Sequence, residues 1–250
     1  MIMFYLLCFH YALCIMHCYL RRGVGIKEGQ ERIVEAYVGE YASGKSEVAL
    51  NRALNLVRRG RQLVTLVDFD LVEPFYTLRP LQKELEKRGL RVLAWETEKT
   101  MGLGEAGTLL KPEIRWALQR AGDVVIDVGY GVAGAGKLAL LANVKECLEL
   151  RVYAVINIAR PLTADVVGVV DYVQSLGTVH GVINNSHWGD DTNIRIIQEG
   201  AQIVTKAAEV LGLPVIGTTL EQRFAEQIKG NKLMGKPLFF LERQMNRYLW

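Results

Sequence analysis

The sequence predicts an α/β protein with a mostly parallel, twisted sheet of about seven strands and helices on both faces. From residue 33 onward, short apolar runs alternate with longer helix-like stretches, as in repeated strand–helix–strand units. Several runs are continuously apolar, which is typical of strands covered on both faces. Residues 39–46 form a glycine-rich turn between a predicted strand and a predicted helix, which also favours this class.

Seven segments are predicted to be strands because they are short, apolar and rich in β-branched residues. They are residues 32–38, 62–69, 90–95, 123–128, 151–157, 179–184 and 213–218. Right-handed crossovers between parallel strands place a ligand site at the carboxyl ends of the strands. We therefore expect the functional residues at that edge of the sheet.

Helices are expected between these strands. They are residues 45–59, 77–88, 110–121, 135–148, 163–176, 194–212 and 221–229. The C-terminal residues 236–250 also carry large apolar side chains at helical spacing. Burying five such side chains is worth about 1.5–3 kcal/mol each, whereas each basic residue near an anionic membrane contributes about 1 kcal/mol. We expect this segment to be a helix packed on the sheet and not a membrane-inserting one.

The composition predicts a single domain over residues 24–250. The chain has 250 residues, of which 50% are hydrophobic and 23% charged, enough for one sizeable core. The net charge of +3 is small and spread along the chain, so no nucleic-acid partner is expected. After residue 18 the only cysteine is Cys147, as in a reduced cytoplasmic protein.

Residues 1–23 form an apolar N-terminal extension of a different kind. The first twenty residues contain no Asp, Glu, Lys or Arg and are followed by Arg21 and Arg22. As a helix they would extend about 30 Å, enough to cross a membrane. Two interpretations stay open: translation starting near Val24, which the break in composition favours, or an anchor that keeps residues 24–250 cytoplasmic. A membrane partner is expected only if residues 1–20 are an anchor.

Residues 39–46, "GEYASGKS", fit the phosphate-binding pattern G-x4-G-K-[ST] at every fixed position. The glycines let the backbone curl so that successive N–H groups point at phosphates, and the following helix N-terminus adds partial positive charge. Lys45 would reach the β- and γ-phosphates, and the Ser46 hydroxyl would bind magnesium. The predicted nucleotide-binding residues of this loop are Gly39, Glu40, Tyr41, Ala42, Ser43, Gly44, Lys45 and Ser46.

A second string, "GVAGAGKL" at residues 131–138, spells a similar pattern. Leu138 stands where the magnesium-binding hydroxyl would be, and leucine cannot bind a metal. We interpret this segment as a glycine-rich switch loop that runs into a helix.

Three carboxylates are predicted at the same edge of the sheet. Asp127 ends the apolar run of residues 123–128, the position from which an aspartate holds magnesium through a water. Asp68 and Asp70 follow the second predicted strand, and the alternation of strand side chains places both on one face. They can serve the magnesium water shell and position an attacking water. The predicted metal-binding residues are Ser46, Asp127 and Asp68.

With these motifs, the chain resembles the MinD/ParA-type P-loop ATPases over roughly residues 33 to 240. The resemblance also draws on "INNS" at 183–186 and on the late segment "LGLPVIGT". It implies ATP and Mg²⁺ as cofactors, with Lys45 and Asp70 as the catalytic residues. In that family the residue matching Asp70 orients the hydrolytic water, and the one matching Asn185 bonds the adenine edge.

One position departs from the family pattern. MinD and ParA proteins carry a signature lysine after the first glycine of the loop, and it reaches the nucleotide of a dimer partner. Here that position is Glu40, whose carboxylate would repel a triphosphate unless it turns outward. A trans-acting dimer is therefore not implied, although a homodimer is not excluded.

Further expectations concern the base and nearby residues. Residues 183–191 contain no N-K-x-D guanine motif, so ATP is favoured over GTP. Thr163 is expected to cap a helix. His180 and His187 have no metal-binding partner at suitable spacing and are expected to be structural or exposed.

The function that fits best is a slow, magnesium-dependent ATPase that acts as a nucleotide switch on a protein partner, in the manner of accessory ATPases that mature metal centres. One alternative is a small-molecule kinase or carboxylate-activating ligase on the same fold. Another is an ATPase that organises DNA or membranes, which Glu40 and the low net charge disfavour.

Overall fold

A computed structural model describes residues 31–70, 78–94, 111–228 and 230–245. These residues build one nine-stranded sheet in the order β3-β2-β4-β1-β5-β6-β7-β9-β8. Neighbouring strands pair in parallel from β3 to β9, and β8 pairs antiparallel with β9. The predicted fold class is confirmed.

The strands have the following bounds: β1 Val34–Gly39, β2 Val64–Phe69, β3 Leu90–Leu93, β4 Asp123–Val128, β5 Leu150–Ile156, β6 Gly181–Asn184, β7 Val215–Glu221, β8 Lys232–Leu233 and β9 Lys236–Leu241. The α-helices are α2 Lys45–Arg58, α3 Gln82–Lys87, α5 Pro112–Arg115, α6 Gly131–Gly136, α7 Val166–Ser175 and α8 Ile194–Leu211. Short 3₁₀ turns are η2 Arg79–Leu81, η4 Ala117–Gln119, η5 Lys137–Leu140, η6 Pro161–Thr163, η7 Gly189–Asp191 and η8 Gln222–Gln227.

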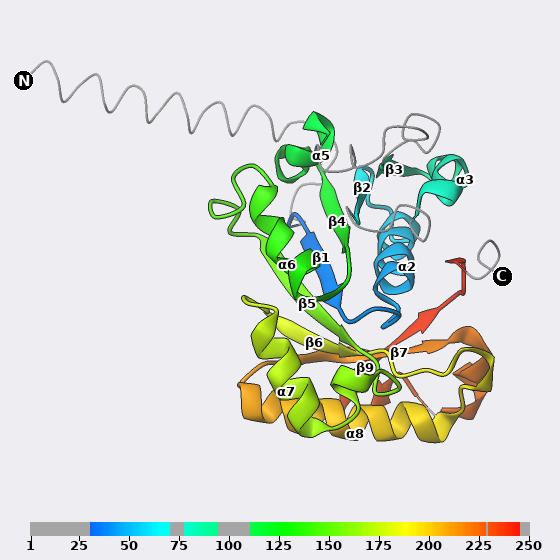
Figure 1. Ribbon diagram of the computed structural model, residues 1–250. Coiled ribbons are helices and arrows are strands. Elements are labelled where there is room, and N and C mark those ends of the chain that lie inside the picture. Colours follow the sequence, from blue (N-terminus) through cyan, green and yellow to red (C-terminus); the bar gives the residue numbers. More distant parts are fainter. Residues whose placement is uncertain (1–30, 71–77, 95–110, 229, 246–250) are drawn as a thin grey trace, which may run out of the picture.

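Helices cover both faces of the sheet (Figure 1). Alternate residues of the central strands explain this arrangement: Val124 and Ile126 of β4 pack into the core beneath α5, α6, α7 and α8, whereas Val125 packs into the core beneath α2 and α3. Every residue of β1, β2 and β4 is buried. Continuous burial on two faces is what makes these strands continuously apolar in sequence.

The sheet has nine strands and not seven, because residues 232–241 form a hairpin at one edge. Its two-residue turn, Met234 and Gly235, has positive φ at both positions, which matches the twist of paired strands. The helix expected over residues 236–250 is therefore wrong as far as the structure describes it. Leu238 and Leu241, spaced as on a helix, are instead buried side chains of β9, a strand that pairs with β7 on one side and β8 on the other.

Three of the expected helices are also much shorter than predicted. Residues 110–121 contain α5 and η4, residues 135–148 contain the end of α6 followed by η5, and residues 221–229 contain the 3₁₀ turn η8. By contrast, α2, α7 and α8 lie within a few residues of their expected bounds. The N-terminal extension lies outside the described residues. Among the residues that are described, no helix is both long and apolar enough to span a membrane.

Candidate functional site: a phosphate-binding loop

Residues 39–46 connect β1 to α2 in the curled conformation that the motif requires. Ala42 and Gly44 have positive φ values of 53° and 85°. A Cβ on Gly44 would lie 2.2 Å from Nδ2 of Asn185, so no larger residue fits there. The N-terminus of α2 has no side-chain cap, whereas Asp165 caps α7 and Asn193 caps α8. The first N–H groups of α2 are therefore not occupied by a capping side chain and can bind an anion.

Lys45 and Ser46, in the first turn of α2, lie beside Asp127 at the end of β4. The Lys45 ammonium is buried and donates to the carbonyl oxygen of Glu40 at 3.1 Å. Burial lowers the pKa of Lys45, while the charges of Asp127 and Asp70 oppose that shift. The Ser46 hydroxyl lies close enough to the Asp127 carboxylate to lower its pKa, against the larger effect of burial. A cation, a hydroxyl and a carboxylate thus meet where the motif predicts phosphate and magnesium.

Asp127 is positioned by strand pairing, because its Cα partners are Tyr37 on β1 and Asp68 on β2. Its side chain is 2% exposed, and burial raises its pKa to about 7. Within the described residues, Oδ1 of Asp127 and Oγ of Ser43 are buried without a hydrogen-bond partner. Buried polar atoms left in this state are rare and costly. They fit a hydrated magnesium ion and a phosphate as ligands.

Asp68 and Asp70 both lie close to Asp127. After burial, the negative charges of these two residues also raise the pKa of Asp127. Asp68 is buried, and its Oδ2 lies 3.6 Å from Nε of the buried Arg79. Its Oδ1 accepts the backbone N–H of Asp70 at 3.1 Å. The half-buried Asp70 carboxylate lies against Gly129, where an added Cβ would be 2.9 Å from Oδ1. Asp68 is therefore held by Arg79, while Asp70 lies at the exit of β4.

The Glu40 side chain contacts the turn that follows β5. Its Oε1 accepts the backbone N–H of Leu162 at 3.3 Å, and the Thr163 hydroxyl lies 3.2 Å from its Oε2. Both partners belong to η6, which connects β5 to α7. The residue at the signature-lysine position is thus 9% exposed and bonded within its own chain.

Asn185, directly after β6, supports the loop from the same carboxyl edge of the sheet. Its side-chain amide donates to the carbonyl oxygen of Ser43 at 2.7 Å, and its Oδ1 accepts from the Thr219 hydroxyl. The described contacts of Asn185 therefore hold the loop in place. Its contact with an adenine edge stays a prediction.

Thr163 does not cap a helix, so that prediction is wrong. Asp165 caps α7 by accepting from the N–H of Gly168 at 2.8 Å. The buried Thr163 hydroxyl faces two acceptors, the Glu40 carboxylate and the carbonyl oxygen of Asn157. The helix begins later than the sequence pattern indicates, because Pro161 starts a 3₁₀ turn ahead of it.

The two histidines lie in structural positions. Nδ1 of His180 accepts the N–H of Val152 at 3.0 Å. His187 lies above the loop, where a Cβ on Gly44 would be 3.3 Å from its Nε2. Burial, and then the charges of Arg160 and Arg243, lower the pKa of His187 to about 4. It is therefore neutral at pH 7.

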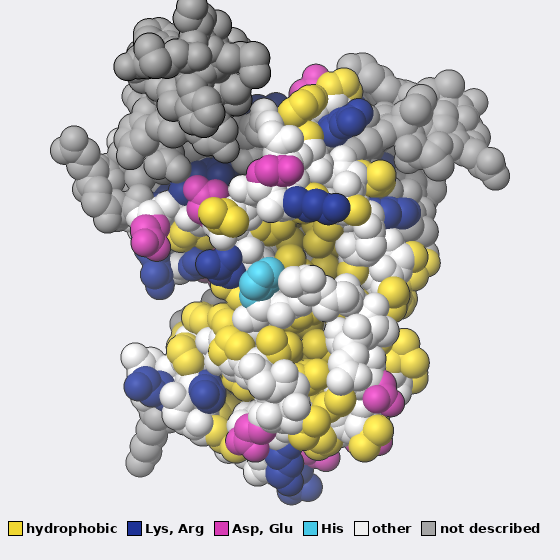
Figure 2. All heavy atoms as spheres, turned by 90° about the vertical axis from the view of Figure 1, so that its left-hand side faces the viewer, with side chains coloured by type: hydrophobic (Ala, Val, Ile, Leu, Met, Phe, Trp, Pro, Cys, Tyr) yellow, Lys and Arg dark blue, Asp and Glu magenta, His cyan; other side chains and the backbone are white. Residues whose placement is uncertain are grey.

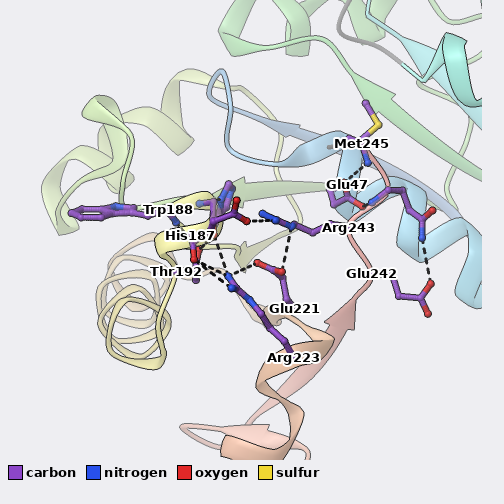
Figure 3. A network of polar contacts seen from close by, with 12 residues as sticks. Glu47, His187, Trp188, Thr192, Glu221, Arg223, Glu242, Arg243 and Met245 are labelled. Atoms are coloured by element: carbon purple, nitrogen blue, oxygen red, sulfur yellow. Dashed lines mark hydrogen bonds and ion pairs between the residues drawn. The ribbon is translucent and has the colours of Figure 1, made fainter. Parts of the chain in front are cut away.

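Residues 242–245, here called the C-terminal strap, pack on the first two turns of α2 (Figure 3). The Glu47 carboxylate accepts the backbone N–H groups of Gln244 and Met245 at 2.8 and 3.0 Å. The Asn51 amide exchanges two hydrogen bonds with the backbone of Glu242, at 2.9 and 3.0 Å. Glu47 directly follows Ser46, yet its charge is directed at the strap and not at the phosphate loop.

Arginine side chains join the strap to the loop after β6. Arg243 pairs with Asp190 and, at 3.3 Å, with Glu221 at the end of β7. Arg223 donates to the carbonyl oxygens of Gly189 and Asp190 at 3.3 Å. No motif marks these residues in the sequence.

The segment 131–138 does not form a second phosphate loop. It starts α6 directly after β4, and Leu138 is buried in the core. A Cβ on Gly134 would lie 2.0 Å from the carbonyl oxygen of Gly129, so the small residues allow close packing against the end of β4. Tyr130, in the same stretch, packs edge-to-face on the exposed Tyr41 of the phosphate loop, with ring centroids 5.4 Å apart.

The described residues contain no group of three or more His, Cys, Asp or Glu side chains that could hold a metal by itself. Magnesium binding by Ser46, Asp127 and Asp68 stays a prediction. Figure 2 shows the face of the molecule seen from the left of Figure 1, where Lys and Arg side chains are interspersed with Asp and Glu. Charges of both signs are mixed on this face.

Among solved structures, the chain is similar to the signal recognition particle receptor FtsY from Elizabethkingia anophelis, with 16% identity, a TM-score of 0.50 and 81% of this chain covered. It is also similar to the cell division protein FtsY from Thermotoga maritima, with 17% identity, a TM-score of 0.50 and the same coverage. The chain spans 62% of the first and 68% of the second structure. No protein-family model and no curated protein matches it. At these identities the similarity concerns the fold alone, which is that of a P-loop NTPase.

Proposed function

We propose that this chain binds ATP with Mg²⁺ at residues 39–46 and hydrolyses it slowly, as a switch that acts on a protein partner. The observation that carries this proposal is the meeting of Lys45 and Ser46 with Asp127, whose Oδ1 has no partner among the described residues. A strand–turn–helix with a merely structural role needs neither a buried lysine nor an unpartnered buried carboxylate oxygen.

The residues divide the chemistry as follows. Bound Mg²⁺ would be held by Ser46 and, through water, by Asp127, and would neutralise phosphate charge. Lys45 would exchange its bond to the Glu40 carbonyl oxygen for one to the β- and γ-phosphates. Asp70, half-buried at the exit of β4, would orient the attacking water. Asp68 supports this edge through Arg79, as a charge close to the metal.

ATP is proposed over GTP because the loop after β6 lacks the guanine motif. Residues 183–191 contain no N-K-x-D sequence, whose aspartate would accept from guanine N–H groups. A competition series with ATP, GTP, CTP and UTP against one fluorescent nucleotide tests the choice of base.

Exposed apolar side chains around the loop support a protein partner. Tyr41, Leu162 and Trp188 are 52%, 56% and 59% exposed, and they lie on three loops at the carboxyl edge of the sheet. Large apolar side chains gathered at a nucleotide site are suited to contacts that change with its occupancy. The MinD/ParA-type family and a homodimer are part of the proposal, whereas the FtsY structures share the fold alone.

Phosphate release from Mg-ATP in the absence of any acceptor tests the proposal. We expect slow turnover by the full-length chain, and Asp70→Asn should bind Mg-ATP nearly as tightly while turning over more slowly in single-turnover measurements. Turnover that requires a small-molecule acceptor would instead establish the kinase or ligase alternative. A wild-type rate for Asp70→Asn would refute the role of Asp70.

A further inference from the structure

Glu40 occupies an unusual place for a carboxylate, because it lies inside a loop that binds phosphate. Two opposite effects on nucleotide affinity follow from its chemistry. A negative charge near phosphates weakens their binding, whereas a side chain that fixes the loop in its binding conformation strengthens it. The contacts of Glu40 indicate which of these two effects on nucleotide affinity is the larger.

The carboxylate contacts the turn between β5 and α7. It bonds the N–H of Leu162 and faces the hydroxyl of Thr163, which also lies 2.8 Å from the carbonyl oxygen of Asn157. On α7, burial raises the pKa of the Tyr172 hydroxyl, and the charge of Glu40 raises it further. The charge of Glu40 is thus held by groups of its own chain.

The backbone of Glu40 contacts the phosphate loop itself. Its carbonyl oxygen accepts from the Lys45 ammonium at 3.1 Å and from the N–H of Ser43 at 3.1 Å. One residue therefore fixes the loop to η6 with its side chain and orients the phosphate-binding lysine with its main chain. Asn185 fixes the loop again at Ser43, so both ends of the curl are held.

We propose that Glu40 is a positioning residue, which anchors the phosphate loop to the Leu162–Thr163 turn and holds Lys45 ready for the triphosphate within a single chain. This role rests on the proposed function. The contacts made by Glu40 are intramolecular, so the loop is organised without a residue from a second copy. The anchor also connects the loop to the exposed Leu162, on the surface proposed for the partner.

The test uses the full-length chain, Mg²⁺ with ATP in turnover assays, and the non-hydrolysable AMP-PNP in calorimetry. Glu40→Ala should raise KM and the AMP-PNP dissociation constant about tenfold, the effect of losing one charge-assisted hydrogen bond, and leave kcat within about twofold. Glu40→Gln keeps an acceptor for the N–H of Leu162 and should stay within about threefold of wild type.

Thr163→Val is the matched variant, because it removes the hydroxyl partner and keeps the Glu40 charge. Thr163→Val should also weaken AMP-PNP binding. The double variant Glu40→Ala/Thr163→Val should bind AMP-PNP within about twofold of the affinity of Glu40→Ala alone. If Glu40→Ala and Glu40→Gln bind more tightly and Thr163→Val binds as wild type does, Glu40 acts by repulsion and the positioning role is overturned. Wild-type protein that binds no AMP-PNP would overturn the proposed function itself.

Discussion

The two flanks of the phosphate loop differ in how their polar groups are satisfied. On the outer flank, the Glu40 carboxylate bonds η6 and the Ser43 carbonyl oxygen bonds Asn185. On the inner flank, Oδ1 of Asp127 and Oγ of Ser43 are buried without partners among the described residues. Even within Ser43, the backbone is held by the protein while the hydroxyl is not.

The outer flank, whose polar groups are bonded, acts as a scaffold for the loop. The inner flank, whose polar groups have no partners among the described residues, is the proposed binding site. A buried polar atom without a partner costs about 1–3 kcal/mol, and a ligand that supplies the missing bond recovers it. The satisfied flank keeps the loop curled, and the unsatisfied flank is where a ligand gains most. Changes on the inner flank should therefore affect nucleotide binding, whereas changes on the outer flank should affect both the stability of the protein and binding.

The largest effect is expected for Lys45→Ala on the inner flank. Loss of a charge-assisted contact to phosphate should weaken Mg-ATP binding by about 2 kcal/mol or more, roughly thirtyfold. Lys137→Ala is the matched control, because Lys137 belongs to the similar string at residues 131–138 and should leave binding unchanged. Calorimetric titration of both variants measures the difference, and equal losses would contradict the assignment.

On the outer flank, His187 should make the protein sensitive to acid. Burial lowers its folded pKa to about 4 from 6.5, so the unfolded chain binds more protons between these values. Above pH 6.5 the buried, neutral His187 does not reduce the free energy of unfolding. As the pH falls toward 4, the free energy of unfolding decreases, by about 2 kcal/mol at pH 5. Urea unfolding at pH 7 and pH 5 should show this loss in wild type and not in His187→Gln. Parallel losses in both proteins would exclude His187 as the cause.

Asn185→Ala should remove the support beneath Ser43. Loss of the two buried hydrogen bonds of the Asn185 amide should lower the free energy of unfolding by about 1–2 kcal/mol and also weaken nucleotide binding. Thermal unfolding and calorimetry measure both effects. Unchanged unfolding together with weakened binding would place Asn185 at the base and not beneath the loop.

The smallest effect is expected for Arg243→Gln in the C-terminal strap. Its ion pairs with Asp190 and Glu221 are partly exposed, so their loss should cost at most about 1 kcal/mol of stability. The difference from wild type should shrink in 0.5 M salt, roughly the range in which exposed charges are screened. A large, salt-independent loss would show that the strap supports the fold through more than these ion pairs.

The predictable parts of the site are those set by local sequence. Lys45 and Ser46 follow from a motif eight residues long, and Asp127 follows from the end of an apolar strand. Parallel pairing of neighbouring strands then brings Asp127 next to Ser46. The expected α2, α7 and α8 also agree with the structure, because long periodic segments carry a strong local signal.

The parts that could not be predicted depend on distant contacts. Glu40 meets Thr163 across 123 residues, and Glu47 meets Gln244 across 197, so no local pattern reports where either carboxylate points. The sequence does not indicate the C-terminal strand β9, because Leu238 and Leu241 fit a helix period and the hairpin turn begins with Met234, which is not a typical turn residue. Residues 236–241 form a strand and not a helix because they hydrogen-bond the edge of β7.

The most direct test of the central claim is a calorimetric titration of the full-length chain with ATP in the presence of Mg²⁺ and again in EDTA. We expect saturable binding of one nucleotide per chain, which weakens in EDTA because Ser46 and Asp127 then lose the ion they would hold. Folded protein that binds no ATP with Mg²⁺ would contradict the claim that residues 39–46 form a working phosphate site. Equal affinity in EDTA would contradict the metal role of Ser46 and Asp127.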